Sequence, residues 1–172
     1  MSNQVVIKAN SSTFEVYPNA DRLVLTRRGI TRIPENIGDL KDLTHLDLSE
    51  NELTTLPESI GKLVILLRLI IEDTSITSLP NSIGNFVNLE YLSIKRSSIT
   101  SLPESIGNLK YLTEIHLEHN KLTSLPVDIG NLTKLTSLNL AKHYLSQIFF
   151  LVREHKLIVI YYFLEVLMTI YY

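Results

Sequence analysis

Apolar residues recur along most of the chain in the pattern L-x-x-L-x-L, and this pattern itself returns every 23 residues. One full unit runs from Leu43 to Ile65, and units beginning at Leu66, Leu89 and Leu112 align with it without gaps. Alternating apolar and polar residues are typical of a strand with one buried face. We therefore expect one short strand in each unit, with its leucines and isoleucines pointing inward.

Each predicted strand is followed by the phrase L-P-x-x-I-G-x-L, which marks a short return segment. Proline suits the first turn of a helix, where its missing N–H costs nothing, and the acidic Glu58 and Glu104 that follow it suit the positive end of a helix. The glycine is expected to let the chain turn back toward the next strand. The two columns are Pro34, Pro57, Pro80, Pro103 and Pro126, and Gly38, Gly61, Gly84, Gly107 and Gly130.

A single unit cannot bury its own leucines, so neighbouring units must stack and their strands must run parallel. A first unit begins at Ala20, and a sixth begins at Leu135 but loses the pattern near Phe149. The predicted fold class is an α/β-type repeat, a solenoid with strands on one side and short helical or 3-10 returns on the other. Its segments are an N-terminal cap over 1–19, the repeats over 20–148, and an apolar C-terminal cap or tail over 149–172.

The full phrase L-x-x-L-x-L-x-x-N-x-L-x-x-L-P-x-x-I-G-x-L resembles the 23-residue type of leucine-rich repeat, over about residues 20–148. That type occurs in bacterial repeat proteins, in plant intracellular Ras-group proteins and in the animal Ras-scaffold and Ras-suppressor proteins. The resemblance implies a right-handed curved solenoid, with parallel strands on its concave face, that binds other proteins. A scaffold for a small GTPase or phosphatase follows from the analogy alone.

One column departs from the pattern of this family. The asparagine that bonds neighbouring repeats in the family is replaced at most positions here. Threonine and serine still offer a donor and an acceptor, with shorter reach. We expect the ladder to be weaker across the third and fourth units, which would be the softer middle of the solenoid. The column reads Arg28, Asn51, Thr74, Ser97, Asn120 and His143.

The two ends lie outside the repeat. Residues 4–17 form two alternating stretches around a polar Asn-Ser-Ser turn, which predicts a β cap; a disordered leader is the alternative. The C-terminal segment is apolar on every face, which indicates burial or lipid contact. A cap of one or two helices, a dimer contact, a membrane contact through 157–172 and an out-of-frame ending remain open. The stretch from 157 to 172 is short for a bilayer span and contains Glu165.

Composition narrows the classes of function. The chain has 172 residues, a formal net charge of −2 and no cysteine. Nothing in that charge favours nucleic acid or anionic lipid, and disulfides and thiol catalysis are excluded. The N-terminus lacks the basic and apolar regions of a signal peptide, so we expect a cytoplasmic protein.

Motifs of catalysis are also missing from the sequence. Nucleotide-binding, nucleophile-elbow and metalloprotease signatures are not found, so we expect no enzyme activity and no cofactor. Glu114, His116 and Glu118 alternate along one predicted strand face. Three ligands in a line, about 6.6 Å apart, cannot converge on one metal ion without help from neighbouring strands. We therefore expect a solvated polar strand face there.

Comparing the repeats with one another separates residues needed for folding from residues available for function. Positions that recur in every unit are explained by folding, whereas the outward strand positions differ and are free to specify a partner. Arginine, tyrosine and an apolar residue at the centre, together with mixed charges, suit a protein or peptide partner. A merely solvated face, with binding elsewhere, is the alternative; we expect a monomer. The candidate partner-binding residues are His45, Asp47, Arg68, Ile70, Glu72, Tyr91, Ser93, Lys95, Glu114, His116 and Glu118.

Overall fold

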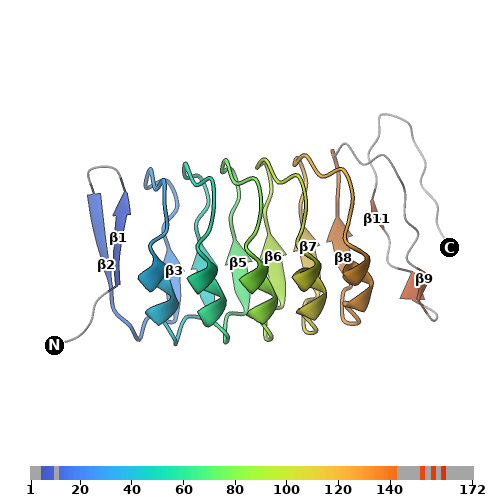
Figure 1. Ribbon diagram of the computed structural model, residues 1–172, viewed down its shortest axis with the longest axis horizontal. Helices are drawn as coiled ribbons and strands as arrows, with labels where there is room; N and C mark the ends of the chain where they lie inside the picture. The colour runs from blue at the N-terminus through green and yellow to red at the C-terminus, as the bar shows by residue number, and fades with distance from the viewer. Residues whose placement is uncertain (1–4, 10–11, 143–151, 154–155, 158–159, 162–172) are drawn as a thin grey trace.

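Six three-residue strands lie side by side along the molecule in the computed structural model, which describes residues 5–9, 12–142, 152–153, 156–157 and 160–161 (Figure 1). All six pair in parallel, and each residue pairs with the residue 23 positions later. The register therefore repeats the period of the sequence. The strands are β3 (Arg22–Val24), β4 (His45–Asp47), β5 (Arg68–Ile70), β6 (Tyr91–Ser93), β7 (Glu114–His116) and β8 (Ser137–Asn139).

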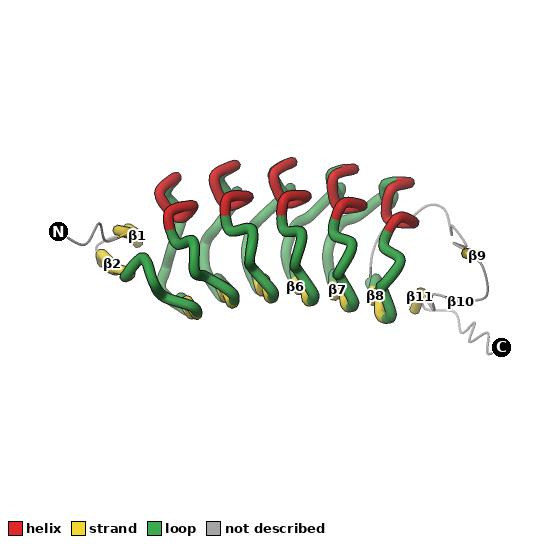
Figure 2. Tube along the Cα trace, turned by 90° about the horizontal axis from the view of Figure 1, so that it is seen from below, coloured by secondary structure: helices red, strands yellow, loops and turns green. Residues whose placement is uncertain are grey.

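In the described part of the chain, five short 3-10 helices cover the side opposite the strands (Figure 2). The proline is the residue just before each helix rather than part of its first turn, as Pro57 shows with φ −73°. Its carbonyl accepts the N–H of Ile60 at 3.1 Å, which starts the helix. The predicted solenoid with 3-10 returns is confirmed. The helices are η1 (Glu35–Asp39), η2 (Glu58–Lys62), η3 (Asn81–Asn85), η4 (Glu104–Asn108) and η5 (Val127–Asn131).

One continuous apolar core lies between the strands and the helices. The inward residues of each strand segment, such as Leu69, Ile71 and Leu92, are fully buried. The helices contribute a buried isoleucine each, and Phe86 fills the position where other units have leucine. Because the core runs through every unit, each repeat covers the apolar face of the next.

The glycine column is explained by close contact between helices and not by the turn that we expected. Among the described residues, Gly29 alone of the glycines has a positive φ. A Cβ on Gly61 would instead lie 2.5 Å from the Cβ of Ser82 and 2.6 Å from its carbonyl oxygen. Gly38, Gly84 and Gly107 face the same backbone position of the following helix. Only glycine lets successive helices approach this closely.

The left-handed turn that follows each strand is made by residues other than glycine. Their φ values lie between 47° and 61°, a region that costs L-residues energy. The backbone N–H groups of these residues, from Arg27 to His119, donate to carbonyls of the neighbouring repeat, which holds the residues in place; Asp73 N–H, for example, donates to Lys95 O at 2.9 Å. This column is Arg27, Glu50, Asp73, Arg96, His119 and Lys142.

The asparagine column is buried and bonds the turns of neighbouring repeats. Asn51 donates from Nδ2 to the carbonyls of Leu25 and Leu48, both at 2.8 Å, and its Oδ1 accepts the N–H of Ile30 at 3.0 Å. Asn120 makes the corresponding bonds, to Ile94 and Ile99 of the preceding repeat and to Leu117 of its own. Between these two asparagines, Thr74 and Ser97 occupy the column and bond to each other.

Thr74 and Ser97 join their hydroxyls at 3.0 Å, and Ser97 Oγ also accepts the Thr74 N–H at 3.4 Å. Both residues are buried. Fewer bonds are made here than at Asn51, in keeping with the expected weaker ladder; that this makes the middle softer stays a prediction. His143 lies outside the described residues.

The N-terminal residues form an antiparallel hairpin of β1 (Val5–Ala9) and β2 (Ser12–Val16). Val16 is buried in the core, and Phe14 packs against it. Arg28 of the first repeat lies over the Phe14 ring, with Cζ 5.4 Å from the ring centroid. The two strands therefore lie where two alternating stretches were expected; their role as a cap stays a prediction.

The C-terminal segment is described at three short strands. β9 (Val152–Arg153) and β10 (Lys156–Leu157) form an antiparallel pair. β11 (Ile160–Tyr161) pairs in parallel with β8 and adds a seventh strand to the main sheet. We expected one or two helices, and the described residues of this segment are strands instead. Phe149 and Glu165 lie outside the described residues, so the alternatives of a dimer or membrane contact stay predictions.

Replacing Leu92 with alanine should lower the free energy of unfolding by about 2–5 kcal/mol, because the side chain is fully buried and leaves a cavity. Denaturant unfolding measures the loss. Val87→Ala is the control, since Val87 is 51% exposed. Equal effects of the two substitutions would mean that the inward face of the strands is misassigned.

Replacing Gly61 with alanine should destabilise the protein by about 1–3 kcal/mol, since the new methyl group overlaps Ser82 and pushes η2 and η3 apart. Asn85→Ala, at an exposed position of η3, should change the free energy of unfolding by less than about 0.5 kcal/mol. Urea unfolding of both variants makes the comparison. A neutral Gly61→Ala would show that close helix contact does not explain the glycine column.

Candidate functional site

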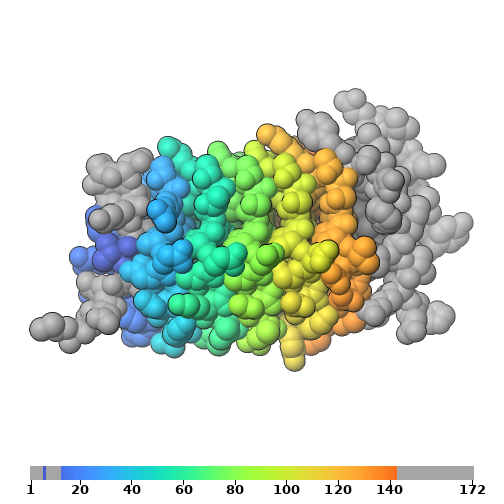
Figure 3. Space-filling view, in the orientation of Figure 1, coloured from blue at the N-terminus to red at the C-terminus, as the bar shows by residue number. Residues whose placement is uncertain are grey.

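The outward residues of the six strands form straight columns on the concave face. Because the strands pair in register, Arg68 lies beside His45 and Tyr91, and Ile70 lies beside Asp47 and Ser93. Figure 3 shows the successive repeats as adjacent bands along the molecule. The first column is Arg22, His45, Arg68, Tyr91, Glu114 and Ser137, and the second is Val24, Asp47, Ile70, Ser93, His116 and Asn139.

A third column follows the strands and is held by the same ladder. Backbone N–H groups of the intervening residues continue to donate to the next repeat, as Leu48 does to Ile70 O at 2.9 Å and Ile71 to Ser93 O at 2.8 Å. Glu72 N–H donates to Ser49 Oγ at 3.0 Å. The third column comprises Thr26, Ser49, Glu72, Lys95, Glu118 and Ala141.

An aromatic ring lies at the centre of the concave face. The guanidinium carbon of Arg68 is 3.9 Å from the centroid of the Tyr91 ring, and the ring of His116 is 5.3 Å from it and tilted by 40°. These side chains come from β5, β6 and β7. Stacking of this kind stabilises the orientation of each side chain. The structure thus brings together Arg68, Tyr91 and His116 from the predicted set.

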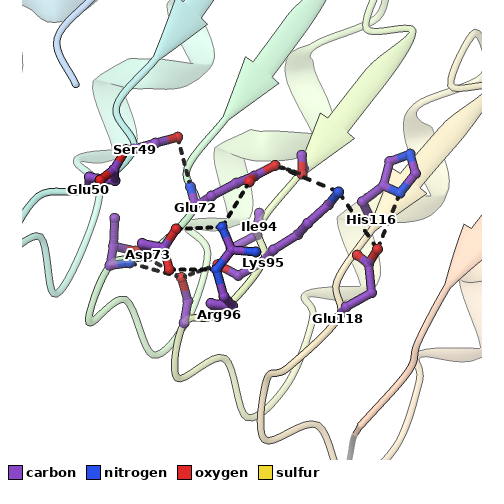
Figure 4. Close-up of polar contacts among 12 residues, drawn as sticks. Ser49, Glu50, Glu72, Asp73, Ile94, Lys95, Arg96, His116 and Glu118 are labelled. Carbon is purple, nitrogen blue, oxygen red and sulfur yellow. Dashed lines mark hydrogen bonds and ion pairs between the residues drawn. The ribbon is translucent and has the colours of Figure 1, made fainter. Parts of the chain in front are cut away.

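Charged side chains form a cluster in the third column (Figure 4). Lys95 Nζ is 3.9 Å from Glu72 Oε1 and 3.7 Å from Glu118 Oε1. All three side chains are largely covered, with 15–24% of their surface exposed. Both separations exceed a hydrogen bond, so the ammonium is held by charge and not by a fixed geometry.

The carboxylates of this cluster are positioned by neutral partners. Glu72 Oε1 accepts the Ser93 hydroxyl, and Glu118 Oε1 accepts Asn139 Nδ2 at 2.7 Å. Ser93 is fully buried beneath Glu72. Our prediction of Ser93 as a partner-contacting residue is therefore wrong in its role, because its hydroxyl is committed to Glu72; it positions that carboxylate.

Asp73 and Arg96 form a two-point ion pair at the margin of the face. The Arg96 guanidinium donates from Nε and Nη2 to the two oxygens of Asp73, each at 2.6 Å. This pair lowers the pKa of Asp73 and raises that of Arg96. Sequence reasoning left Asp73 out of the site. In the sequence, this pair is indicated by two residues of opposite charge that lie 23 positions apart in the column of positive-φ residues. Arg27 and Glu50 have the same spacing and also form an ion pair.

The alternating trio of Glu114 and His116 on β7 and Glu118 just after it does not converge on a metal position. No group of metal-ligating side chains is found within the described residues. His116 Nε2 is 3.2 Å from Glu114 Oε2, and its Nδ1 is 3.7 Å from Glu118 Oε1. The trio is thus a connected polar network, and it is more buried than the solvated face that we expected, since His116 and Glu118 are 18% and 15% exposed.

The other end of the face is formed by His45, with Arg22 and Arg68 on either side. Burial lowers the pKa of His45, and the positive charges of Arg22 and Arg68 lower it further. The His45 ring therefore stays neutral near neutral pH, and the positive charge of this end rests on the two arginines. Asp47 Oδ1 accepts the N–H of Ser49 at 3.0 Å. Ile70 is half-buried between these residues and Ser93.

Comparisons with known proteins agree with this geometry. The family model described as a leucine-rich repeat region matches residues 22–94 and 80–149. The chain belongs to the leucine-rich repeat family. Its repeats have the 23-residue period, and this period aligns the outward residues of the strands.

Solved structures of bacterial leucine-rich repeat proteins are similar to this chain. A leucine-rich repeat protein of Leptospira interrogans is 36% identical with a TM-score of 0.73, and the match covers 75% of this chain and 33% of that one. The functional domain of InlJ from Listeria monocytogenes is 26% identical with a TM-score of 0.64, covering 74% and 26%. This leucine-rich repeat chain therefore spans about a third or less of either protein. No curated protein matches it.

The Listeria domain includes a cysteine ladder, whereas this chain has no cysteine and bonds its repeats through Asn51, Asn120 and the Thr74–Ser97 pair. The described part of the chain contains no helix of the length and hydropathy needed to cross a membrane.

The Asp73–Arg96 pair should show a coupling of about 0.2–1 kcal/mol at about pH 7, the range of exposed ion pairs. A double-mutant cycle with Asp73→Asn and Arg96→Gln, read by denaturant unfolding, measures it. Because the folded-state pKa of Asp73 is lowered, the stabilisation is present above the unfolded pKa and is lost as the pH falls through the folded one. A coupling that persisted below the folded-state pKa would contradict the ion pair.

Proposed function

We propose that this leucine-rich repeat protein is a non-enzymatic interaction module that binds another protein or peptide across its concave strand face. The observation that carries the proposal is that each repeat has two kinds of position, those that recur in every unit and those that vary. Inward residues and glycines recur because the stack requires them, whereas the outward columns change from unit to unit. Strands pair through backbone groups, so these outward side chains are not needed for strand pairing.

The centre of the face has the composition of a binding site. Arg68 and Tyr91 are stacked on each other, and Ile70 adds an apolar surface beside them. Arginine and tyrosine are enriched among residues that dominate binding energy, and stacking fixes them before a partner arrives. Less ordering is then needed on association. The proposed contact residues are those predicted from the sequence, with Ser93 as a positioning residue.

The charges of the face are mixed, which suits a protein better than a nucleic acid. Arg22 and Arg68 lie toward the N-terminal repeats, and Glu114 and Glu118 lie toward the C-terminal repeats. A partner with charges of both signs would be oriented along the strand order. We propose a monomer that acts in the cytoplasm without a cofactor.

A second candidate places function in the C-terminal segment. Strand β11 extends the sheet there, and a partner or a second copy could be held by this segment while the solenoid acts as a spacer. Binding that survives every concave-face substitution would favour this alternative.

The proposal is tested by affinity capture from a lysate of the cells that produce the protein, with quantitative identification of what is retained. Tyr91→Ala and Arg68→Glu should each lower capture by at least about tenfold, the effect of removing a residue worth 1.4 kcal/mol. Their free energies of unfolding should change by less than about 1 kcal/mol, because neither side chain belongs to the core.

Matched controls make the result specific to the face. Tyr111→Ala removes an exposed tyrosine from the turn after η4, and Arg32→Glu reverses an exposed arginine ahead of η1. Both controls should retain capture. If the concave variants and the controls capture equally well, binding does not occur on the concave face. A large loss of stability in Tyr91→Ala would instead show that the strand faces are misassigned.

A further inference from the structure

Two arginines on the N-terminal half of the concave face have no anionic partner among the described residues. Arg22 on β3 and Arg68 on β5 are both exposed, and no carboxylate in the described part of the chain lies within 4 Å of either guanidinium. By contrast, three other cations of the face and its margin each pair with a carboxylate of a neighbouring repeat. Those pairs are Arg27–Glu50, Lys95–Glu72 and Arg96–Asp73.

The guanidinium of Arg68 is held in place, yet its hydrogen-bond donors stay available. Its carbon lies 3.9 Å from the centroid of the Tyr91 ring, so the contact is made with the face of the ring. Within the part of the chain that the structure describes, no side-chain N–H of Arg68 donates to an oxygen or a nitrogen. These donors form a planar fork that matches the two oxygens of a carboxylate. Because Tyr91 already orients the group, little ordering is needed when an anion binds.

His45 lies between the two arginines in the same column. The strands β3, β4 and β5 pair in register, at a spacing of about 4.8 Å, so Arg22, His45 and Arg68 are successive neighbours. His45 Nδ1 is 2.9 Å from Thr44 Oγ1, which orients the ring. Burial lowers the pKa of His45, and the charges of both arginines lower it further, whereas Asp21 opposes them. The arginines therefore create a positive potential at this ring, which attracts an anion.

We infer that the column of Arg22, His45 and Arg68 binds the carboxylates of an acidic segment of a partner protein. Carboxylates placed beside the His45 ring accept hydrogen bonds from the arginine on either side. Glu114 and Glu118 lie on the C-terminal half of the same face, so a long polyanion such as a nucleic acid would be repelled there, whereas a short acidic segment would not. The inference rests on the proposed function, since it names the partner chemistry for the same concave face.

Defined ligands test the inference on the full chain. The probe is a short fluorescent peptide of alternating glutamate and threonine, and the control peptide replaces glutamate with glutamine, which has a similar shape and no charge. Fluorescence anisotropy should show saturable binding of the glutamate peptide, at least about tenfold tighter than that of the glutamine peptide. A labelled oligothymidylate of the same net charge should bind at least about fivefold more weakly than the glutamate peptide.

Variants of the protein locate the site. Arg22→Gln combined with Arg68→Gln should weaken binding of the glutamate peptide by at least about tenfold. Arg32→Gln combined with Lys41→Gln removes the same charge from exposed positions on either side of η1 and should change binding by less than about twofold. Asp47→Asn removes a negative charge two residues from His45 on the same strand face, and should tighten binding by about two- to fivefold. A misfolded variant could not produce that gain.

Titration of His45 gives a readout that does not depend on affinity. The charged groups that face the ring are Arg22 and Asp21 on the β3 side and Arg68 on the β5 side, and Asp47 shares its own strand. Carboxylates bound beside the ring should raise the pKa of His45, and by linkage protonation of His45 should then tighten binding. Nuclear magnetic resonance of the histidine ring protons, with His45→Gln to assign the signal, should show this rise at saturation with the glutamate peptide and not with the glutamine peptide.

Several results would overturn the inference: equal binding of the glutamate and glutamine peptides, binding of the oligothymidylate as tight as that of the glutamate peptide, equal loss in the Arg32 and Lys41 control, weaker binding in Asp47→Asn, or an unchanged pKa of His45 at saturation. Its failure is separable from failure of the proposed function. If the glutamate peptide does not bind but Tyr91→Ala still lowers capture, the concave face binds a partner of other chemistry. If neither effect is seen, both fail.

Discussion

The structure depends on contact between repeats that are displaced by one constant step of 23 residues. Successive 3-10 helices approach closely in this contact, where Gly38, Gly61, Gly84 and Gly107 face the backbone of the next helix. No side chain fits between them, so the glycine column sets how closely the units stack. Strand pairing on the opposite side follows the same step. Both sides of the solenoid therefore keep one register.

This register has consequences for recognition as well as for folding. Because every outward residue lies beside its equivalents in the next repeats, side chains far apart in sequence become neighbours without any loop to bring them together. Arg68, Tyr91 and His116 come from three units and form one stack. The charged cluster of Glu72, Lys95 and Glu118 is assembled in the same way. The fold thus offers a rigid surface whose composition can vary freely.

Most of the fold was predictable from the sequence because equivalent positions in successive repeats have the same structural environment and therefore the same type of residue. Leucine spacing predicted the strands and their register, and proline spacing predicted the short returns. The glycine role was predicted wrongly, since a turn and a close contact both demand glycine and the sequence does not separate them. The C-terminal strands were also unforeseen, because a segment that is apolar on every face has no period that would separate strand from helix.

The candidate site was predictable as a set of positions but not as a set of contacts. Column membership follows from the period, so Arg68, Tyr91 and Glu114 were placed correctly. The burial of Ser93 and the Asp73–Arg96 pair depend on how long side chains fold over their neighbours, which spacing does not define. The residues at positive φ show the same limit, because Arg96 is of a type uncommon there and is held by a bond to the next repeat.

Deleting one repeat tests the central claim most directly, since the claim is that a step of 23 residues governs both fold and face. A chain lacking residues 66–88 should unfold cooperatively in urea, with a slope reduced in proportion to its smaller buried surface. A chain lacking residues 67–88, one residue fewer, places every later unit out of step and should lose cooperative unfolding. Similar unfolding curves for the two deletions would contradict the account.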